Sequence, residues 1–80
     1  MDREKFDYSK LKGRITEICD SQKVFAERLG VSEGTLVSKL KCNTYFTQNE
    51  IFRASEILGI SPANIAAYFF MPSVQKVEQY

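Results

Sequence analysis

The sequence predicts an all-helical domain built from five short helices. Apolar residues recur at helical spacing, capping residues precede several of these runs, and glycine or proline follows them. A chain of 80 residues is close to the lower limit for one hydrophobic core, so we expect a single domain over residues 1–80. Within it we place the folded core at about residues 8–70 and a tail at 71–80.

The first helix is predicted over residues 9–19. Its apolar residues share one helical face, which we expect to be buried: Leu11, Ile15, Ile18 and Cys19. Gly13 faces away from this stripe, where it either permits a close approach or is simply tolerated. Two cysteines do not form a disulfide framework; we expect Cys19 to be a buried thiol and Cys42 to be exposed or half-buried.

The second and third helices are predicted at residues 22–29 and 33–41. Ser21 and Ser32 are suitable N-caps, and Gly30 suits the left-handed position that ends a helix. Because the turn between the two helices has only three residues, they cannot run antiparallel. We therefore expect a steep crossing, as in a helix-turn-helix.

The fourth helix begins after Thr47, which has capping-box spacing to Glu50, and a glycine ends it. The fifth is expected to use Ser61 as its cap and Pro62 as its first residue. The remaining residues, 73–80, fit a short strand, a frayed helix or a flexible tail.

Composition excludes several classes of protein. No apolar run approaches the roughly 20 residues that span a bilayer, and the N-terminus lacks a signal-peptide core, so we expect a cytoplasmic protein with no membrane partner. The chain has no histidine, no cluster of metal ligands and no glycine-rich phosphate loop. We therefore predict no enzymatic activity, no catalytic residues, no metal, no cofactor and no small-molecule ligand.

Five residues of the predicted second and third helices resemble the helix-turn-helix of lambda-repressor-like and Cro-like phage regulators: Gln22, Ala26, Gly30, Val31 and Leu36. The resemblance covers about residues 8–70, and it is nearest to short Cro-like proteins of phages and prophages in Gram-positive bacteria. It implies a lambda-repressor-like DNA-binding domain in which a small Ala26 lies beneath the crossing helix.

The resemblance also implies a sequence-specific transcriptional regulator, a repressor that binds a pseudo-palindromic operator in double-stranded DNA at the bacterial nucleoid. The third helix would enter the major groove. Its expected base contacts are Ser32, Glu33, Gly34, Thr35 and Ser38. The expected phosphate contacts are Gln22, Lys23, Lys39, Lys41 and Asn43. A net charge of +3 over residues 9–42 agrees with such contacts but also fits a solvated helix surface.

Two of these residues allow alternatives. Glu33 either accepts a hydrogen bond from a cytosine N4 or only complements the positive end of its helix. At Lys39 the family usually has an apolar residue. Either Leu40 is buried instead, or the third helix is rotated from its usual pose.

An aromatic cluster near the C-terminus is too large for one small domain to bury, so we predict a homodimer. Its interface would comprise Ile65, Tyr68, Phe69, Phe70 and Met71; the alternative is extra core packing. Two other functions remain open. The fold could serve an antitoxin or a protein-interaction adaptor, or a structural module without a DNA role, which a sequence pI of about 7.7 slightly favours.

Overall fold

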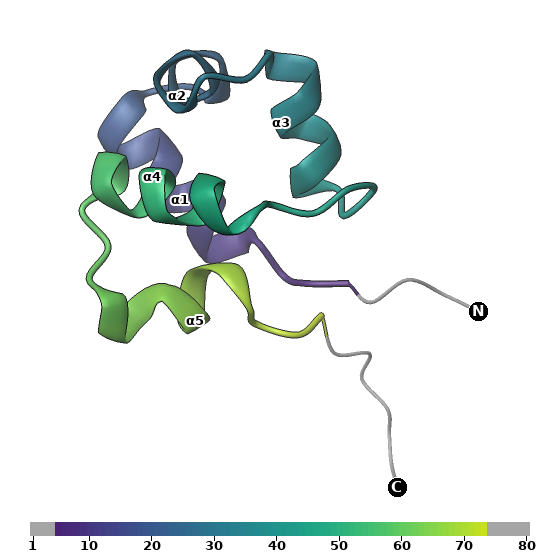
Figure 1. The fold of residues 1–80 in the computed structure, drawn as a ribbon, viewed down its shortest axis with the longest axis vertical. Helices are drawn as coiled ribbons and strands as arrows, with labels where there is room; N and C mark the ends of the chain where they lie inside the picture. The colour runs from purple at the N-terminus through teal and green to yellow at the C-terminus, as the bar shows by residue number, and fades with distance from the viewer. Residues whose placement is uncertain (1–4, 74–80) are drawn as a thin grey trace, which may run out of the picture.

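The computed structural model describes residues 5–73 and confirms the predicted all-helical class (Figure 1). A β-bridge between Phe6 and Pro72 brings the two ends of this region together. No strand occurs over residues 22–58, and the tail prediction for 74–80 lies outside the described residues. The elements are α1 (Ser9–Cys19), α2 (Gln22–Leu29), α3 (Glu33–Leu40), α4 (Gln48–Leu58), the 3-10 turn η1 (Pro62–Asn64) and α5 (Ile65–Phe69).

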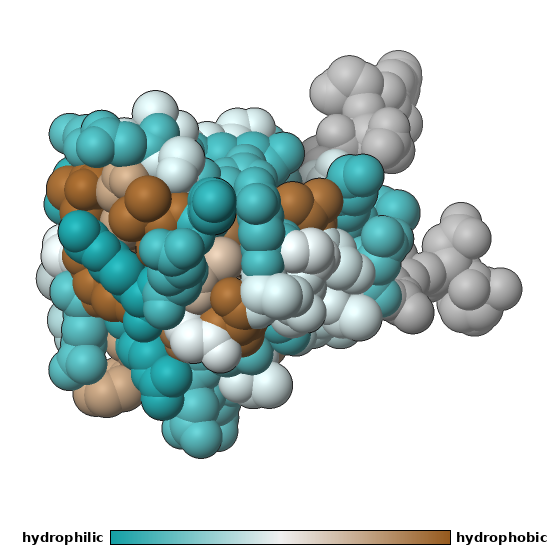
Figure 2. All heavy atoms as spheres, turned by 90° about the horizontal axis from the view of Figure 1, so that it is seen from above, coloured by the Kyte–Doolittle hydropathy of each residue, from teal (hydrophilic) through white to brown (hydrophobic). Residues whose placement is uncertain are grey.

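The hydrophobic core forms around α1, which packs against α2, α4 and α5, while α3 packs mainly against α2. Burial of each large apolar side chain contributes about 1.5–3 kcal/mol, which holds these short helices together. Seen from the α2–α3 end, the surface is mainly polar with separate apolar patches (Figure 2). The largest fully buried side chains are Leu11, Ile15, Phe25, Leu29, Leu36, Leu58 and Phe69.

Capping residues mark most helix starts as predicted. The Ser21 hydroxyl accepts the Val24 amide at 3.2 Å, and Thr47 and Glu50 form a complete capping box. Ser61 is different. It makes no cap bond to the backbone, and its hydroxyl accepts the side-chain amide of Asn64 instead. The fifth helix therefore begins as a 3-10 turn, in which Pro62 takes the first position as expected.

Two helix ends are closed by a glycine together with an arginine from another helix. Gly30 and Gly59 adopt left-handed backbone angles, with φ of 90° and 67°. The Arg53 guanidinium donates to the carbonyl of Leu29 at 3.0 Å, and Arg14 donates likewise at the end of α4. Both arginines thus satisfy carbonyls that have no partner within their own helix.

The structure corrects the predicted burial of two residues. Ile18 lies at the edge of the apolar face of α1 and is 38% exposed, whereas Cys42 is only 4% exposed. Cys42 adopts a left-handed φ of 64° just after α3, a position usually held by glycine. This turn directs its Sγ inward, where it accepts the Phe6 amide at 3.3 Å. Cys19 is buried as predicted, and Gly13 has no neighbour that a side chain would meet, so simple tolerance explains it.

Candidate nucleic-acid interface

The α2–turn–α3 unit has the tight joint that the sequence predicted. Its turn comprises Gly30, Val31 and Ser32, and the amides of Gly30 and Val31 both donate to the Ala26 carbonyl, at 2.9 and 3.0 Å. Ala26 itself is only 1% exposed. Figure 1 looks nearly along the α2 axis, whereas α3 runs across the view, so the two helices cross steeply. A larger side chain at Ala26 would force them apart.

The N-terminal end of α3 is polar and faces solvent. Ser32, Glu33, Gly34 and Thr35 are all exposed, and Ser38, one turn further on, is half-buried. The Ser32 hydroxyl accepts the Thr35 amide at 3.1 Å and lies 2.9 Å from the Thr35 hydroxyl. The cap thus orders the first turn of α3 and holds the two hydroxyls side by side. The five predicted base-contact residues therefore lie together on accessible surface.

Lys39 is the exception among the predicted phosphate contacts. Lys39 is only 7% exposed, and its Nζ lies 3.1 Å from a carboxylate oxygen of Glu50. The same ammonium donates to the Tyr45 carbonyl at 2.9 Å and stands 5.9 Å from the centre of the Phe46 ring. The prediction that Lys39 reaches DNA phosphate is therefore corrected. Here Lys39 and Leu40 are both buried, and the lysine joins the end of α3 to the start of α4.

The ion pair also changes the titration of its carboxyl group. Burial by itself raises the pKa of Glu50, but hydrogen bonds from the Thr47 amide and the Lys39 ammonium outweigh it and place that pKa below its ordinary value of 4.5. Glu50 thus serves two purposes as a carboxylate, since it completes the cap of α4 and neutralises a buried lysine.

The other predicted phosphate contacts remain accessible. Lys23, Lys41 and Asn43 are exposed, and Gln22, at the start of α2, is half-buried. Part of the basic excess seen in the sequence is used within the fold, because Lys39 is buried against Glu50 and the Tyr45 carbonyl. The surface around α3 is consequently less basic than the sequence count suggests.

The predicted dimer residues divide into two groups. Phe69 is 1% exposed and belongs to the core, so its assignment to an interface is corrected. Phe70 and Met71 are 49% and 45% exposed, and Ile65 and Tyr68 are half-buried. Sequence reasoning also missed an aromatic cluster from the other end of the chain, because Phe6 and Tyr8 precede the first helix and follow no helical period.

Two further observations concern only residues 5–73. They contain no group of three or more histidine, cysteine or acidic side chains that could hold a metal ion. None of their helices is long and apolar enough to cross a membrane.

Comparison with known proteins places the chain in a family. The family described as "Protein of unknown function (DUF739)" matches residues 4–72. The chain belongs to this DUF739 family. A comparison with curated proteins found no match.

This DUF739 member is also similar to a solved structure, that of the modulator of repression (MOR) of the temperate bacteriophage TP901-1 from Lactococcus lactis. The two are 42% identical, with a TM-score of 0.73, and the match covers 81% of this chain and 88% of that one. This similarity supports a regulatory role in a phage. It does not test the lambda-repressor-like assignment, which stays a prediction.

Proposed function

We propose that the protein is a phage regulator that binds double-stranded DNA through α3. The observation that carries this proposal is the polar N-terminal end of α3. It projects from a rigid joint at Ala26 and is ordered by the Ser32 cap. A helix of this size fits the major groove, where its first residues reach base edges.

The side chains suit distinct roles in this mode. Ser32, Thr35 and Ser38 carry hydroxyls that donate to or accept from bases, and Gly34 lets the backbone approach. Glu33 is expected to discriminate most strongly between bases, because a carboxylate near phosphates is favourable only where it meets a hydrogen-bond donor such as cytosine N4. The proposed phosphate contacts are Gln22, Lys23, Lys41 and Asn43.

The small number of exposed cations argues for a dimer on DNA. With Lys39 buried, Lys23 and Lys41 are the lysines left among the proposed contacts. Two protomers would neutralise about four phosphates and give a slope of about −3.6 for log affinity against log salt. The proposed dimer surface comprises Ile65, Tyr68, Phe70 and Met71.

Selection of bound fragments from random duplex DNA tests this function. At about 50 mM salt we expect enriched sites with two half-sites separated by about one helical turn. Glu33→Gln should then change the preferred base at one position per half-site. Glu56→Gln, which removes the same charge from an exposed position on α4, is the matched control. If no sequence is enriched at this salt, DNA binding by α3 is refuted.

A second candidate is a protein-interaction adaptor, which includes the antitoxin alternative. The burial of Lys39 and the exposure of Glu33 favour it, since both weaken the attraction of α3 for DNA. In that case no duplex would be retained even at low salt, and regulation would act through a protein partner.

A further inference from the structure

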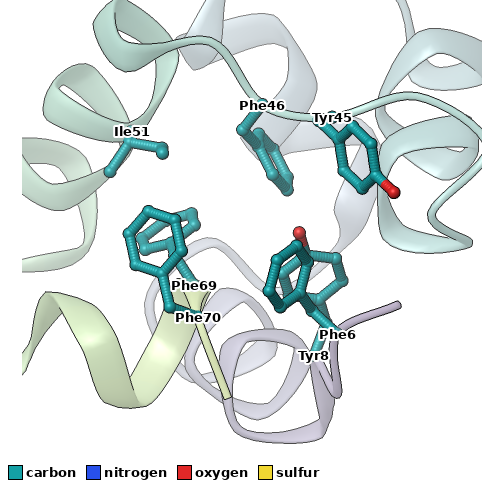
Figure 3. A pocket seen from close by; sticks show the side chains of 7 residues that line it. All are labelled: Phe6, Tyr8, Tyr45, Phe46, Ile51, Phe69 and Phe70. Atoms are coloured by element: carbon teal, nitrogen blue, oxygen red, sulfur yellow. The ribbon is translucent and has the colours of Figure 1, made fainter. Parts of the chain in front are cut away.

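A cleft lined almost entirely by aromatic side chains opens beside the bridge between Phe6 and Pro72 (Figure 3). Its volume is about 290 Å³. Three stretches of the chain supply its walls: residues 6–8 before α1, residues 45–51 across the start of α4, and residues 69–70 at the end of α5. The lining residues are Phe6, Tyr8, Tyr45, Phe46, Ile51, Phe69 and Phe70.

The walls hold one another in place through edge-to-face contacts. Phe6 meets Tyr45 and Phe70 with ring centres 6.0 Å apart in each case. Phe46 meets Tyr8 at 5.6 Å and Phe69 at 5.5 Å. Such contacts are favourable for aromatic pairs, so the cleft is formed in the free protein.

Tyr8 places a polar group in this apolar site. The residue is 5% exposed, and Figure 3 shows its hydroxyl pointing into the cleft toward Phe46. No side chain or carbonyl among residues 5–73 forms a hydrogen bond with this hydroxyl, so it is available to an acceptor that enters the cleft. Burial, with smaller contributions from Cys42 and Tyr45, raises the pKa of Tyr8 to about 12. The group therefore stays protonated and can donate a hydrogen bond.

The backbone beside the cleft does not accept another strand. The Asp7 amide donates to the Met71 carbonyl, and the Ser73 amide donates to the Lys5 carbonyl. The Phe6 amide faces the Cys42 sulfur, and Pro72 has no N–H to offer. An occupant must therefore enter by its side chain.

We propose that the cleft binds an apolar side chain of a partner polypeptide, whose adjacent backbone carbonyl accepts a hydrogen bond from Tyr8. The uncharged lining favours an aromatic or branched aliphatic anchor and a neutral acceptor. A polypeptide suits the site because Tyr45 and Phe70, at 40% and 49% exposure, form an apolar rim that a protein surface would cover. The inference stands whether or not α3 binds DNA.

Titration of the ¹⁵N-labelled protein with N-acetyl-phenylalanine N-methylamide tests the site, and toluene is the probe without a carbonyl. Both should shift amide resonances around the cleft in a saturable way. Tyr8→Phe should weaken binding of the amide by about two- to tenfold and leave toluene binding unchanged. Thr16→Val, which removes a hydroxyl from an exposed position on α1 outside the cleft, is the control.

A displayed library of random peptides tests the polypeptide itself. Peptides selected on the full chain should share one apolar anchor, compete with the capped phenylalanine and lose affinity for Tyr8→Phe. Absence of saturable shifts at the cleft would overturn the proposal, as would equal effects of Tyr8→Phe on both probes. Resonances of Tyr8 and Phe46, inside the cleft, that move with protein concentration alone would identify a second copy as the occupant and overturn it too, whereas changes confined to Phe70 belong to the proposed dimer surface.

Discussion

Replacement of Lys39 by methionine tests whether the buried ion pair joins α3 to α4. The Lys39 side chain is 9% exposed and that of Glu50 is 20% exposed. Removal of one partner from a fully buried pair costs about 3–5 kcal/mol. Because a fifth of Glu50 still meets solvent, we expect a smaller loss of unfolding free energy for Lys39→Met, about 1.5–3 kcal/mol. For a domain of this size that lowers the melting temperature by roughly 6–24 °C.

A double-mutant cycle isolates the interaction from the loss of packing. Glu50→Gln removes the charge but keeps an acceptor for the Thr47 amide, since glutamine also serves in a capping box. Urea unfolding at pH 7 of the two single variants and the double variant should give a coupling free energy of about 1–2 kcal/mol. Additive effects within about 0.3 kcal/mol would refute the reasoning.

The same lysine variant separates a structural role from a phosphate contact. Lys39→Met should leave the salt slope of any DNA binding unchanged, whereas loss of a phosphate contact reduces it by about 0.9. Lys41→Met supplies the comparison, because Lys41 is exposed at the end of α3. A reduced slope for Lys39→Met would show that its ammonium reaches DNA.

Three further predictions follow from local geometry. Ala26→Leu should overpack the crossing and lower the unfolding free energy by about 1–3 kcal/mol in urea melts; an unchanged midpoint would show that the joint is loose. Gly30→Ala should destabilise the fold by about 1–2 kcal/mol, because φ at Gly30 is 90° and a Cβ there would lie 3.2 Å from the Arg53 guanidinium. Gly13→Ala, on the open face of α1, should instead stabilise the fold by about 0.5–1 kcal/mol. Equal changes of melting temperature for the two variants would contradict this contrast. The lowered pKa of Glu50 contributes stability that is present above the unfolded value near 4.5 and is lost as pH falls through the folded value. Glu50→Gln should therefore flatten the decline of stability measured below about pH 4.5, and a parallel decline in both proteins would refute this assignment.

Most of the helical framework could be predicted from the sequence because its signals are local. The caps at Ser21, Ser32 and Thr47 and the glycines at Gly30 and Gly59 act within one turn of chain. Such signals define where helices begin and end without knowledge of their neighbours. The steep crossing of α2 and α3 followed from the three-residue turn for the same reason, whereas the place of Ala26 beneath it was implied by the resemblance to lambda-repressor-like regulators.

Tertiary structure decided what each polar or aromatic side chain does. Nothing local in the sequence shows that Lys39 meets Glu50 across the α3–α4 loop, or that Cys42 turns inward in a conformation usual for glycine. Tyr8 and Phe69 lie 61 residues apart in the chain, yet both line one cleft. Helix periodicity reports only which face of a helix is apolar. Which surface covers that face, and which charge is drawn into the interior, depends on contacts between distant segments, and these exist only once the chain has folded.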